Sequence, residues 1–569
     1  MAVFKKRTVL LLLISLLILS VVVRYPLVEH ERYQADSYFI HFLSQAIVDD
    51  GYAQWAFHPL SYFGYYPLSY PMAVPFLLAE LSELTGLSIE VSILVANICF
   101  AAVFCIGVFV LARQFMQRPE YALLVTLFAI LGARFVDTSY WDGSARGPIA
   151  VLIMLTVFAF LRAASTGQNR LFIVGILFGF ACFATHHMAV LLVLFGLGYA
   201  LAAFQIHYLF VKFKRERRKL AIAFNSMVAI MIAVVAFGFF DFFGELAEAN
   251  LQKTSLFDIN PPAVSILLNA AVSYANQIGF ILPFAFLGIY TLLRRSRLTT
   301  EQLLPLTILF CFIPMLGNSI YVSMILSPLI CVLGTMWLAE LPQNERRRAF
   351  AFTVVVLLVA SSIALPLWST QRWNSREYPG GDTVEVGNQV FNDAVYLSNQ
   401  DKGESAICNT YVLYMRLAAT SEVNFLASGA PLILNGDVSP KEVNENVTWS
   451  ESPFPVNIYE WFVYPGQPNV NIYVLVLIVG GIESITGQGI YASAREYFSS
   501  HTKLVVVLDN NHPSSFIGMW DDYPSKLPSE IREGSFVAHQ HSGSGSLELR
   551  SYSTYQSERV STYLVQLPI

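Results

Sequence analysis

The stretch KKRTVLLLLISLLILSVVV, residues 5–23, decides the fold class because three basic residues precede an uninterrupted apolar run. A run of this length can cross the hydrocarbon core of a bilayer. A secretory signal would also begin this way, but no small-residue cleavage site follows, so we predict a retained first span. The whole chain agrees with this prediction, since 55% of its 569 residues are hydrophobic and only 13% are charged.

Further basic clusters separate the first 367 residues into apolar runs of similar length. Short cytoplasmic loops carry an excess of Lys and Arg, and every cluster falls on that side if the N-terminus is cytoplasmic and the C-terminus extracytoplasmic. We therefore predict a polytopic α-helical membrane protein with about 11 transmembrane helices. The predicted spans are 8–23, 91–112, 120–136, 148–164, 170–185, 188–210, 220–241, 274–293, 302–317, 321–339 and 349–367.

One apolar stretch, YPLSYPMAVPFLLAELSELTG (residues 66–86), is not predicted to span the membrane. A span here would reverse the side on which every later basic cluster falls. We predict instead a helix lying along the membrane surface, within an external loop of residues 24–90. The same loop contains DSYFIHFLSQAI (residues 36–47), which the pattern predicts to be a short amphipathic helix held at the surface by aromatic side chains.

The composition changes after residue 367, since residues 368–569 contain 11 Lys and Arg against 21 Asp and Glu. NIYVLVLIVGG (471–481) and TKLVVVLD (502–509) are typical of buried strands, IYASAREYFSSH (490–501) of a helix, and GSLELRSYSTY (545–555) of a β-rich tail. We therefore predict an extracytoplasmic soluble α/β domain over residues 368–569, and a transmembrane domain over residues 1–367 that includes the loop 24–90.

Ionisable side chains are rare in the middle of the predicted spans and frequent in the predicted external loops. Charged groups near the membrane core usually serve function, and here they would meet at the outer face, where a substrate with a lipid tail and a charged headgroup can bind. They are Asp36, Asp49, Asp50 and His58 in the first external loop, Arg134, Asp137, Asp142 and Arg146 in the second, His186 and His187 in the third, and Glu245, Glu248 and Asp258 in the fourth.

A sugar carried on a polyprenyl phosphate would suit these groups. The phosphate is already a good leaving group, which cations or a metal stabilise, and one carboxylate suffices to deprotonate an acceptor. Attack opposite the phosphate would invert the anomeric centre. We predict Asp36 as this base, Asp142 as the second carboxylate, and Arg134 and Arg146 as phosphate contacts.

Each candidate also has a purely structural explanation, which the sequence leaves open. Asp36 would cap the short helix that follows it. Asp142 and Arg146, four residues apart, would pair with each other. Arg134 would extend to the membrane interface, and the two adjacent histidines would mark a polar turn.

The first loop, with its early Asp36, DDGYAQW (49–55) and YYPLSYP (65–71), resembles the GT-C superfamily of polyprenyl-phosphate-dependent glycosyltransferases. Within it, the chain resembles catalytic subunits of oligosaccharyltransferases, archaeal ones especially, in which the lipid is a dolichol. SYWDGSARGPIAV (139–151) is similar to the second acidic motif of that superfamily. The resemblance implies that Asp36 is catalytic and that Asp142 helps to hold a divalent metal, Mg²⁺ or Mn²⁺, for which His186 and His187 are further candidate ligands.

The chain departs from that family at three places. Ser144 stands where a second acidic ligand is expected. AICNTYVLYMRLA (406–418) lacks the WWDYG motif that reads the protein acceptor, and GNSIYVSMILSPL (317–329) lacks the Arg expected to bind a pyrophosphate. These departures favour transfer of a single sugar from a polyprenyl monophosphate over transfer of an oligosaccharide to protein Asn.

The expected partners are therefore a polyprenyl-phosphate-linked sugar donor, a glycan, glycolipid or protein acceptor, and the lipid bilayer, with no nucleic acid. The expected location is the cell membrane. Three alternatives remain open: protein N-glycosylation of the oligosaccharyltransferase kind, a lipid or glycolipid transporter or flippase, and a non-enzymatic surface or assembly protein.

Overall fold

The structure is a computed structural model. It describes residues 6–26, 30–31, 35–52, 72–209, 222–231, 274–275, 278–295, 298–312, 319–340, 345–374, 388–400, 405–408, 411–421, 423–425, 447–449, 470–472, 503–509, 535–539, 546–556 and 560–566. Contacts divide the chain into a helical unit, Met1–Leu27 with Leu94–Trp373, and a mixed unit, Val28–Ile93 with Asn374–Ile569. This division places residues 28–93 with the C-terminal residues, whereas the predicted division kept the loop 24–90 with the spans.

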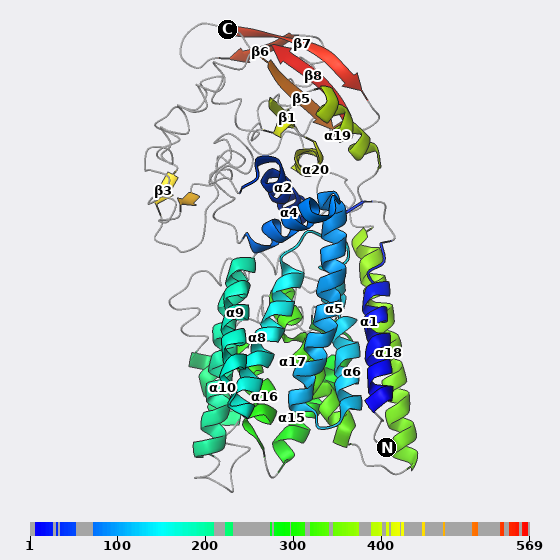
Figure 1. Cartoon of the computed structure of the whole chain (residues 1–569), viewed down its shortest axis with the longest axis vertical. Helices are drawn as coiled ribbons and strands as arrows, with labels where there is room; N and C mark the ends of the chain where they lie inside the picture. Colours follow the sequence, from blue (N-terminus) through cyan, green and yellow to red (C-terminus); the bar gives the residue numbers. More distant parts are fainter. Residues whose placement is uncertain are drawn as a thin grey trace, which may run out of the picture. The chain divides into compact units, whose positions relative to one another are not determined.

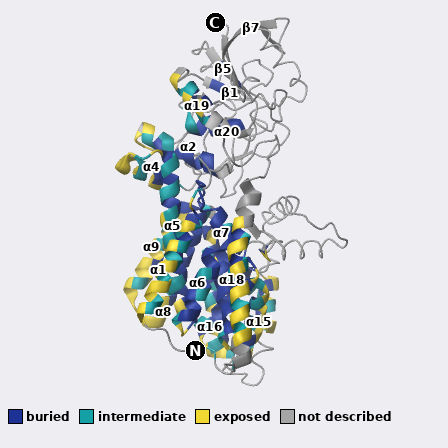
Figure 2. Ribbon diagram, turned by 90° about the vertical axis from the view of Figure 1, so that its right-hand side faces the viewer, coloured by how far each residue is buried: buried dark blue, intermediate teal, exposed yellow. Residues whose placement is uncertain are grey.

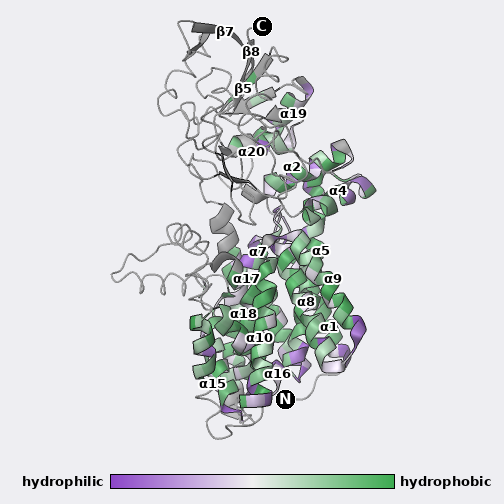
Figure 3. Cartoon of the chain, turned by 90° about the vertical axis from the view of Figure 1, so that its left-hand side faces the viewer, coloured by the Kyte–Doolittle hydropathy of each residue, from purple (hydrophilic) through white to green (hydrophobic). Residues whose placement is uncertain are grey.

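The helical unit is a bundle of apolar helices (Figures 1 and 3). Five helices among the described residues are long and apolar enough to cross a membrane: Ile89–Phe115, Arg146–Thr166, Met188–Leu209, Val322–Glu340 and Ala349–Leu367. Its elements are α1 (Lys6–Val22), α5 (Ile89–Phe115), α6 (Pro119–Ile130), α7 (Ala133–Asp137), α8 (Arg146–Thr166), α9 (Asn169–Thr185), η1 (His187–Leu191), α10 (Leu192–Phe204), the π-helical turn η2 (Gln205–Leu209), the helix Ile222–Met231, α15 (Ile281–Arg294), α16 (Thr300–Phe312), α17 (Ser319–Glu340) and α18 (Glu345–Asn374).

Each predicted span coincides, wholly or in part, with one of these helices. The predicted span 120–136 is wrong as a single helix, because α6 ends at Ile130 and the short α7 begins at Ala133. Gly132 lies at this break as the N-cap of α7. Glycine loses more backbone freedom in a helix than any other residue, so the apolar run is interrupted here despite its hydrophobicity.

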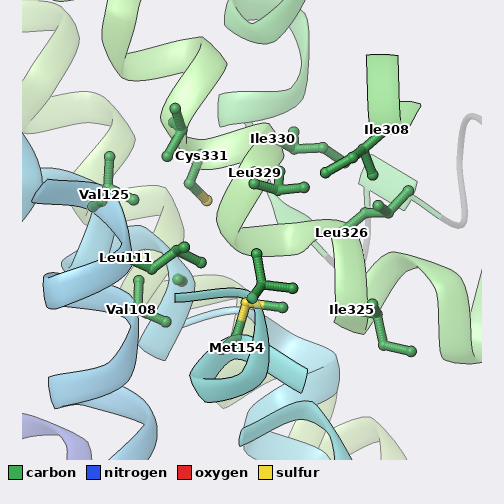
Figure 4. Packing of buried hydrophobic residues seen from close by; sticks show 14 of the residues in the cluster. Val108, Leu111, Val125, Met154, Ile308, Ile325, Leu326, Leu329, Ile330 and Cys331 are labelled. Atoms are coloured by element: carbon green, nitrogen blue, oxygen red, sulfur yellow. The ribbon is translucent and has the colours of Figure 1, made fainter. Parts of the chain in front are cut away.

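Burial separates the central helices from the peripheral ones (Figure 2). The apolar window of α17 is 89% buried, whereas that of α18 is 17% buried. Figure 4 shows the packing around α17, where Ile325, Leu326 and Leu329 belong to one buried cluster with Ile308 of α16 and Met154 of α8. A surface as apolar and as exposed as that of α18 is stable only against lipid, so burial and composition together define a membrane bundle.

The backbones of α15 and α17 approach closely at one point. A Cβ atom at Gly288 of α15 would collide with the backbone carbonyl of Leu333 in α17. Small residues at helix contacts are how membrane helices gain close packing, since lipid supplies no hydrophobic force between them.

The mixed unit combines helices with a six-stranded sheet of order β2-β1-β5-β8-β7-β6. β1 pairs in parallel with β2 and β5, and the other pairs are antiparallel. The elements are α2 (Ala35–Asp50), α4 (Ala73–Thr85), α19 (Asn388–Gln400), α20 (Tyr411–Thr420), β1 (Ser405–Cys408), β2 (Asn424–Phe425), β5 (Lys503–Asp509), β6 (Ser535–His539), β7 (Ser546–Gln556) and β8 (Val560–Gln566), with β3 (Val447–Trp449) and β4 (Val470–Ile472) as a separate pair.

Several predicted elements of this unit are confirmed. The strand predicted at 502–509 is β5, and β7 lies in the β-rich tail predicted near 545–555. The helix predicted at 36–47 is α2, and α4 is a helix within 66–86. Of the strand predicted at 471–481 the structure describes only the part in β4, and the helix predicted at 490–501 lies outside the described residues.

Candidate functional site

The segment between α6 and α8, residues 131–145, is a buried part of the helical unit and overlaps the second predicted external loop. Asp142 is 0% exposed, and its backbone carbonyl accepts a hydrogen bond of 2.9 Å from Asn97 Nδ2 of α5. Asp137, at the end of α7, is also buried. Burial of a charged group is costly unless its surroundings are polar, so this loop is a specialised part of the bundle.

Arg24, just beyond α1, is a fully buried cation against this loop. Its Nε donates to Ser139 Oγ at 2.7 Å, and its Nη1 donates to the carbonyl of Ser20 at 2.7 Å. The guanidinium also lies over the ring of Phe135, 4.8 Å from the centroid. These contacts hold the loop to the end of α1, and they place a positive charge beside the segment that carries Asp137 and Asp142.

Ser144 has a local structural role. Its Oγ accepts a hydrogen bond of 3.2 Å from the backbone N–H of Arg146, the first residue of α8. The first N–H groups of a helix lack partners within the helix, and a serine oxygen commonly supplies one. The residue that stands where the resemblance expects an acid therefore stabilises the start of α8.

The two candidate arginines, Arg134 of α7 and Arg146 of α8, are both half-buried. Arg146 stands at the N-terminus of a 21-residue helix, where backbone N–H groups and the helix dipole favour an anion. Both residues lie within a short segment that also contains Asp142. The structure therefore brings three of the predicted site residues to one end of the helical unit.

His186 lies at that same end, because α8 and α9 pack side by side and the chain reverses at Gly167 (Figure 1). It is buried, and its Nδ1 accepts a hydrogen bond of 3.0 Å from the N–H of Met188, so it caps η1. This geometry supports the polar-turn interpretation. The side chain of His187 lies outside the described residues.

The described part of the chain does not supply a complete ligand set for the divalent metal expected from the resemblance. Among the described residues, no group of three or more His, Cys, Asp or Glu side chains is arranged to hold a metal ion. Asp142 is the one carboxylate of the second motif. Ser144 stands at the other position, and its hydroxyl oxygen accepts a hydrogen bond from the Arg146 N–H at the start of α8.

Asp36 lies in the mixed unit, in the first turn of α2. Its side chain, and that of Asp50, lie outside the described ones, as do residues His58, Glu245, Glu248 and Asp258. Asp49, near the end of α2, is exposed and accepts a hydrogen bond of 2.8 Å from Gln45.

The interpretation of α2 as a helix held at the membrane surface is wrong. Tyr38 is 0% exposed and Phe39 is 7% exposed, and the helix packs on α4 and α20. The aromatic stripe therefore faces protein, and α2 has the support of a core helix. Such support fixes the backbone that carries Asp36.

A chain of hydrogen bonds inside the mixed unit ties α2 to its neighbours. Glu31 Oε1 lies 2.6 Å from His41 Nδ1 of α2, and the Tyr38 hydroxyl donates to the Glu31 carbonyl at 3.4 Å. Glu90 Oε1, in the first turn of α5, lies 3.0 Å from His30 Nδ1 and accepts from the Glu31 N–H at 3.0 Å. We call Glu31, His41, Glu90 and His30 the α2 anchor.

The charges of the α2 anchor favour bound protons. Burial raises the pKa of the Glu31 carboxyl, and the charge and hydrogen bond of His41 offset this only in part. For His41, burial lowers the pKa, but the Glu31 charge, the hydrogen bond to Glu31 and the Glu90 charge together outweigh burial and raise it. Both groups therefore hold a proton more tightly in the folded protein than in water.

Sequence reasoning missed Arg24, Asn97 and the α2 anchor. For His41 the sequence contained one signal. It lies five residues after Asp36 among apolar residues, and an imidazole buried there needs a hydrogen-bond partner. For Asn97, the signal was an amide in an otherwise apolar span.

Comparison with solved structures gives the fold its class. The Archaeoglobus fulgidus oligosaccharyltransferase in complex with zinc and sulfate matches with a TM-score of 0.55 and 11% identity, over 88% of this chain and 68% of that one. The archaeal oligosaccharyltransferase AglB from the same organism, in complex with an inhibitory peptide and a dolichol-phosphate, matches with a TM-score of 0.54 and 12% identity, over 96% and 75%. No family model and no curated protein sequence matches the chain.

The chain therefore has the fold of these archaeal oligosaccharyltransferases, and the resemblance expected from the sequence is confirmed at the level of fold. The prediction of a polytopic helical membrane protein is confirmed with it.

Proposed function

We propose that this protein is a membrane glycosyltransferase that takes its sugar from a polyprenyl-phosphate-linked donor. The observation that supports this most strongly is the fold, which matches an enzyme solved with a dolichol-phosphate. A fold alone does not define chemistry, so the site residues carry the rest of the proposal.

The proposed reaction is a single displacement on the extracytoplasmic side of the cell membrane. A carboxylate oxygen of Asp36 takes the proton of an acceptor hydroxyl, and the acceptor oxygen attacks the anomeric carbon from the face opposite the phosphate. The bond between that carbon and the phosphate oxygen breaks, and its electron pair leaves with the polyprenyl phosphate. The products are an inverted glycoside and the free lipid phosphate.

The leaving phosphate gains negative charge as this bond breaks. Arg146 at the N-terminus of α8 and Arg134 in α7 are proposed to bind it, since guanidinium groups pair with phosphate in a bidentate manner. Asp142 is proposed as the second carboxylate of the reaction. Its burial within the loop that Arg24 holds supports a fixed position for this group.

The test is transfer from a radiolabelled polyprenyl-phosphate sugar by purified protein in membrane extract. Asp36→Asn is expected to lower transfer by about 10²- to 10⁴-fold, the usual worth of a general base. Asp142→Asn is also expected to lower it. Asp49→Asn is the matched control, because Asp49 is an exposed aspartate of the same helix.

Full transfer by Asp36→Asn would rule out the proposed base. Addition of EDTA to the wild-type reaction tests the metal expected from the resemblance. No transfer from any polyprenyl-phosphate sugar, by protein that remains folded, would favour a transporter or an assembly protein instead.

A second candidate function is protein N-glycosylation. It is favoured by a match to the Archaeoglobus fulgidus enzyme tethered to an acceptor peptide with the NVT sequon, with a TM-score of 0.51 and 13% identity. A peptide with an Asn-x-Thr sequence and a hydroxyl acceptor, offered in separate reactions, distinguish the two functions. Because the sequence lacks the WWDYG motif, we expect the hydroxyl acceptor to be the substrate.

A further inference from the structure

A cavity of about 520 Å³ lies within the helical unit, between α8, α9, α10 and α16. Its walls are apolar, with aromatic rings from three of these helices, and its volume is in the range of sites that bind small molecules. Its lining includes Phe160, Phe172, Phe195, Leu304, Gly179 and Gly196.

Two glycines leave space in this cavity that a side chain would fill. A Cβ atom at Gly179 or at Gly196 would meet no atom within 4 Å. By contrast, a Cβ at Gly198, on the same helix as Gly196, would lie 2.7 Å from Ile308. Gly179 and Gly196 are therefore not explained by close helix packing, and each costs its helix about 1 kcal/mol relative to alanine.

The cavity reaches the turn between α8 and α9, where Gly167, Gln168 and Asn169 belong to its lining. Arg162 and Arg170 flank this turn, and both are exposed. No acidic residue occurs in the sequence from residue 143 to residue 215.

The surroundings of the cavity are those of a lipid-facing surface. On α9, Phe172 is 53% exposed and Leu177 is 60% exposed, although both side chains are large and apolar. In a membrane bundle such side chains contact acyl chains. An apolar cavity that reaches a turn flanked by two exposed arginines is complementary to a lipid whose headgroup carries a negative charge.

We propose that this cavity binds an acyl chain of an anionic phospholipid, whose phosphate lies at Arg162 and Arg170. The α8 residues that line the cavity lie between Thr156 and Ala164, in the half of the helix away from Arg146. The proposed donor phosphate binds near Arg146, so the phospholipid occupies a separate site. The inference does not rest on the proposed glycosyltransferase function.

The experiment measures thermal unfolding of full-length, delipidated protein in detergent, after addition of phosphatidylglycerol, of phosphatidylcholine with the same chains, or of a polyprenyl phosphate. A ligand that binds only the folded state raises the melting temperature. Phosphatidylglycerol is expected to raise it most for the wild type. Gly196→Leu, which fills the cavity, is expected to weaken this lipid's binding by about tenfold or more.

Val193→Leu is the matched control, because Val193 lies on the same helix, is 64% exposed and is not part of the lining. It should respond to phosphatidylglycerol as the wild type does. Arg162→Gln with Arg170→Gln should remove the difference between phosphatidylglycerol and phosphatidylcholine. Gly179→Leu, on a different helix, provides a second way of filling the cavity if Gly196→Leu fails to fold.

Three results would overturn the proposal. The first is an equal response of the wild type and both glycine variants to phosphatidylglycerol. The second is no response of the wild type to any lipid. The third is a response to the polyprenyl phosphate alone, which would assign the cavity to the lipid tail of a donor.

Discussion

His41 Nδ1 lies 2.6 Å from Glu31 Oε1, and both side chains are buried. This pair joins α2, the helix that carries Asp36, to the segment that precedes it. Glu90 and His30 extend the pair through hydrogen bonds to the start of α5. The position of the proposed base thus depends on a buried set of ionisable groups.

The α2 anchor makes stability depend on pH. His41 and Glu31 both have a pKa raised above their ordinary values of 6.5 and 4.5. The folded protein therefore binds more protons than the unfolded chain, so this contribution to stability is fully present below the unfolded pKa values and is lost as the pH rises through the folded ones. We expect the melting temperature to rise as the pH falls from about 8 to about 6.

His41→Gln is expected to reduce this slope, since one of the two groups with a raised pKa is removed. His207→Gln is the control, because His207 is exposed. A slope that His41→Gln leaves unchanged would contradict the assignment of the pH dependence to the α2 anchor.

Arg24 is expected to stabilise the helical unit through its hydrogen bonds to Ser139 and Ser20. Arg24→Leu should lower the free energy of unfolding by about 2 to 3 kcal/mol, because charged hydrogen bonds to buried groups are lost. Arg7→Gln is the control, since Arg7 is an exposed arginine of α1, the helix that precedes Arg24. Denaturant unfolding of both variants checks this, and equal stability would show that Arg24 is dispensable for the loop.

Asn97 is expected to act as a positioning residue for Asp142, since its Nδ2 donates to the Asp142 carbonyl. Asn97→Leu should lower the free energy of unfolding by about 1 kcal/mol, because the loop loses this hydrogen bond. If the proposed function holds, sugar transfer should fall more than this loss of stability explains. Ser92→Ala is the control, because Ser92 Oγ, on the same helix, hydrogen-bonds to no described residue. Equal losses of kcat/KM in both variants would reject the positioning role.

Gly288 and Gly179 provide a matched pair of alanine substitutions. Gly288→Ala forces a Cβ against the carbonyl of Leu333, and overpacking of this kind costs about 1 to 3 kcal/mol or more. Gly179→Ala places its Cβ in open space and should be neutral or slightly stabilising. Thermal unfolding of the two variants in the same detergent measures the difference, and similar melting temperatures would contradict the close approach of α15 and α17.

The membrane helices could be predicted because each is defined locally, by an apolar run between basic clusters. The same holds for β5 and for α2 as a helix. The burial of α2 could not be predicted, because Tyr38 and Phe39 suit a membrane interface and a protein core equally well. Their partner α20 begins only at Tyr411, far along the chain.

The same limit applies to the site. Asp142 and Arg146 could be selected because they lie together in one short loop. Arg24 could not, since its partner Ser139 is 115 residues away and nothing in the local sequence indicates that this first residue after the span is buried.

The chain contributes to the mixed unit twice, first with residues 28–93 and again from residue 374. During synthesis, α2 and α4 are made long before α19 and α20. The face of α2 that contacts α20 is therefore covered by α20 only after the intervening membrane helices have been synthesised. His30 stacks on Phe391 with ring centroids 3.6 Å apart, so this contact also forms only after Phe391 has been synthesised. A fragment that begins at residue 374 therefore lacks part of its own core, and the mixed unit is complete only when the last third of the chain has left the ribosome.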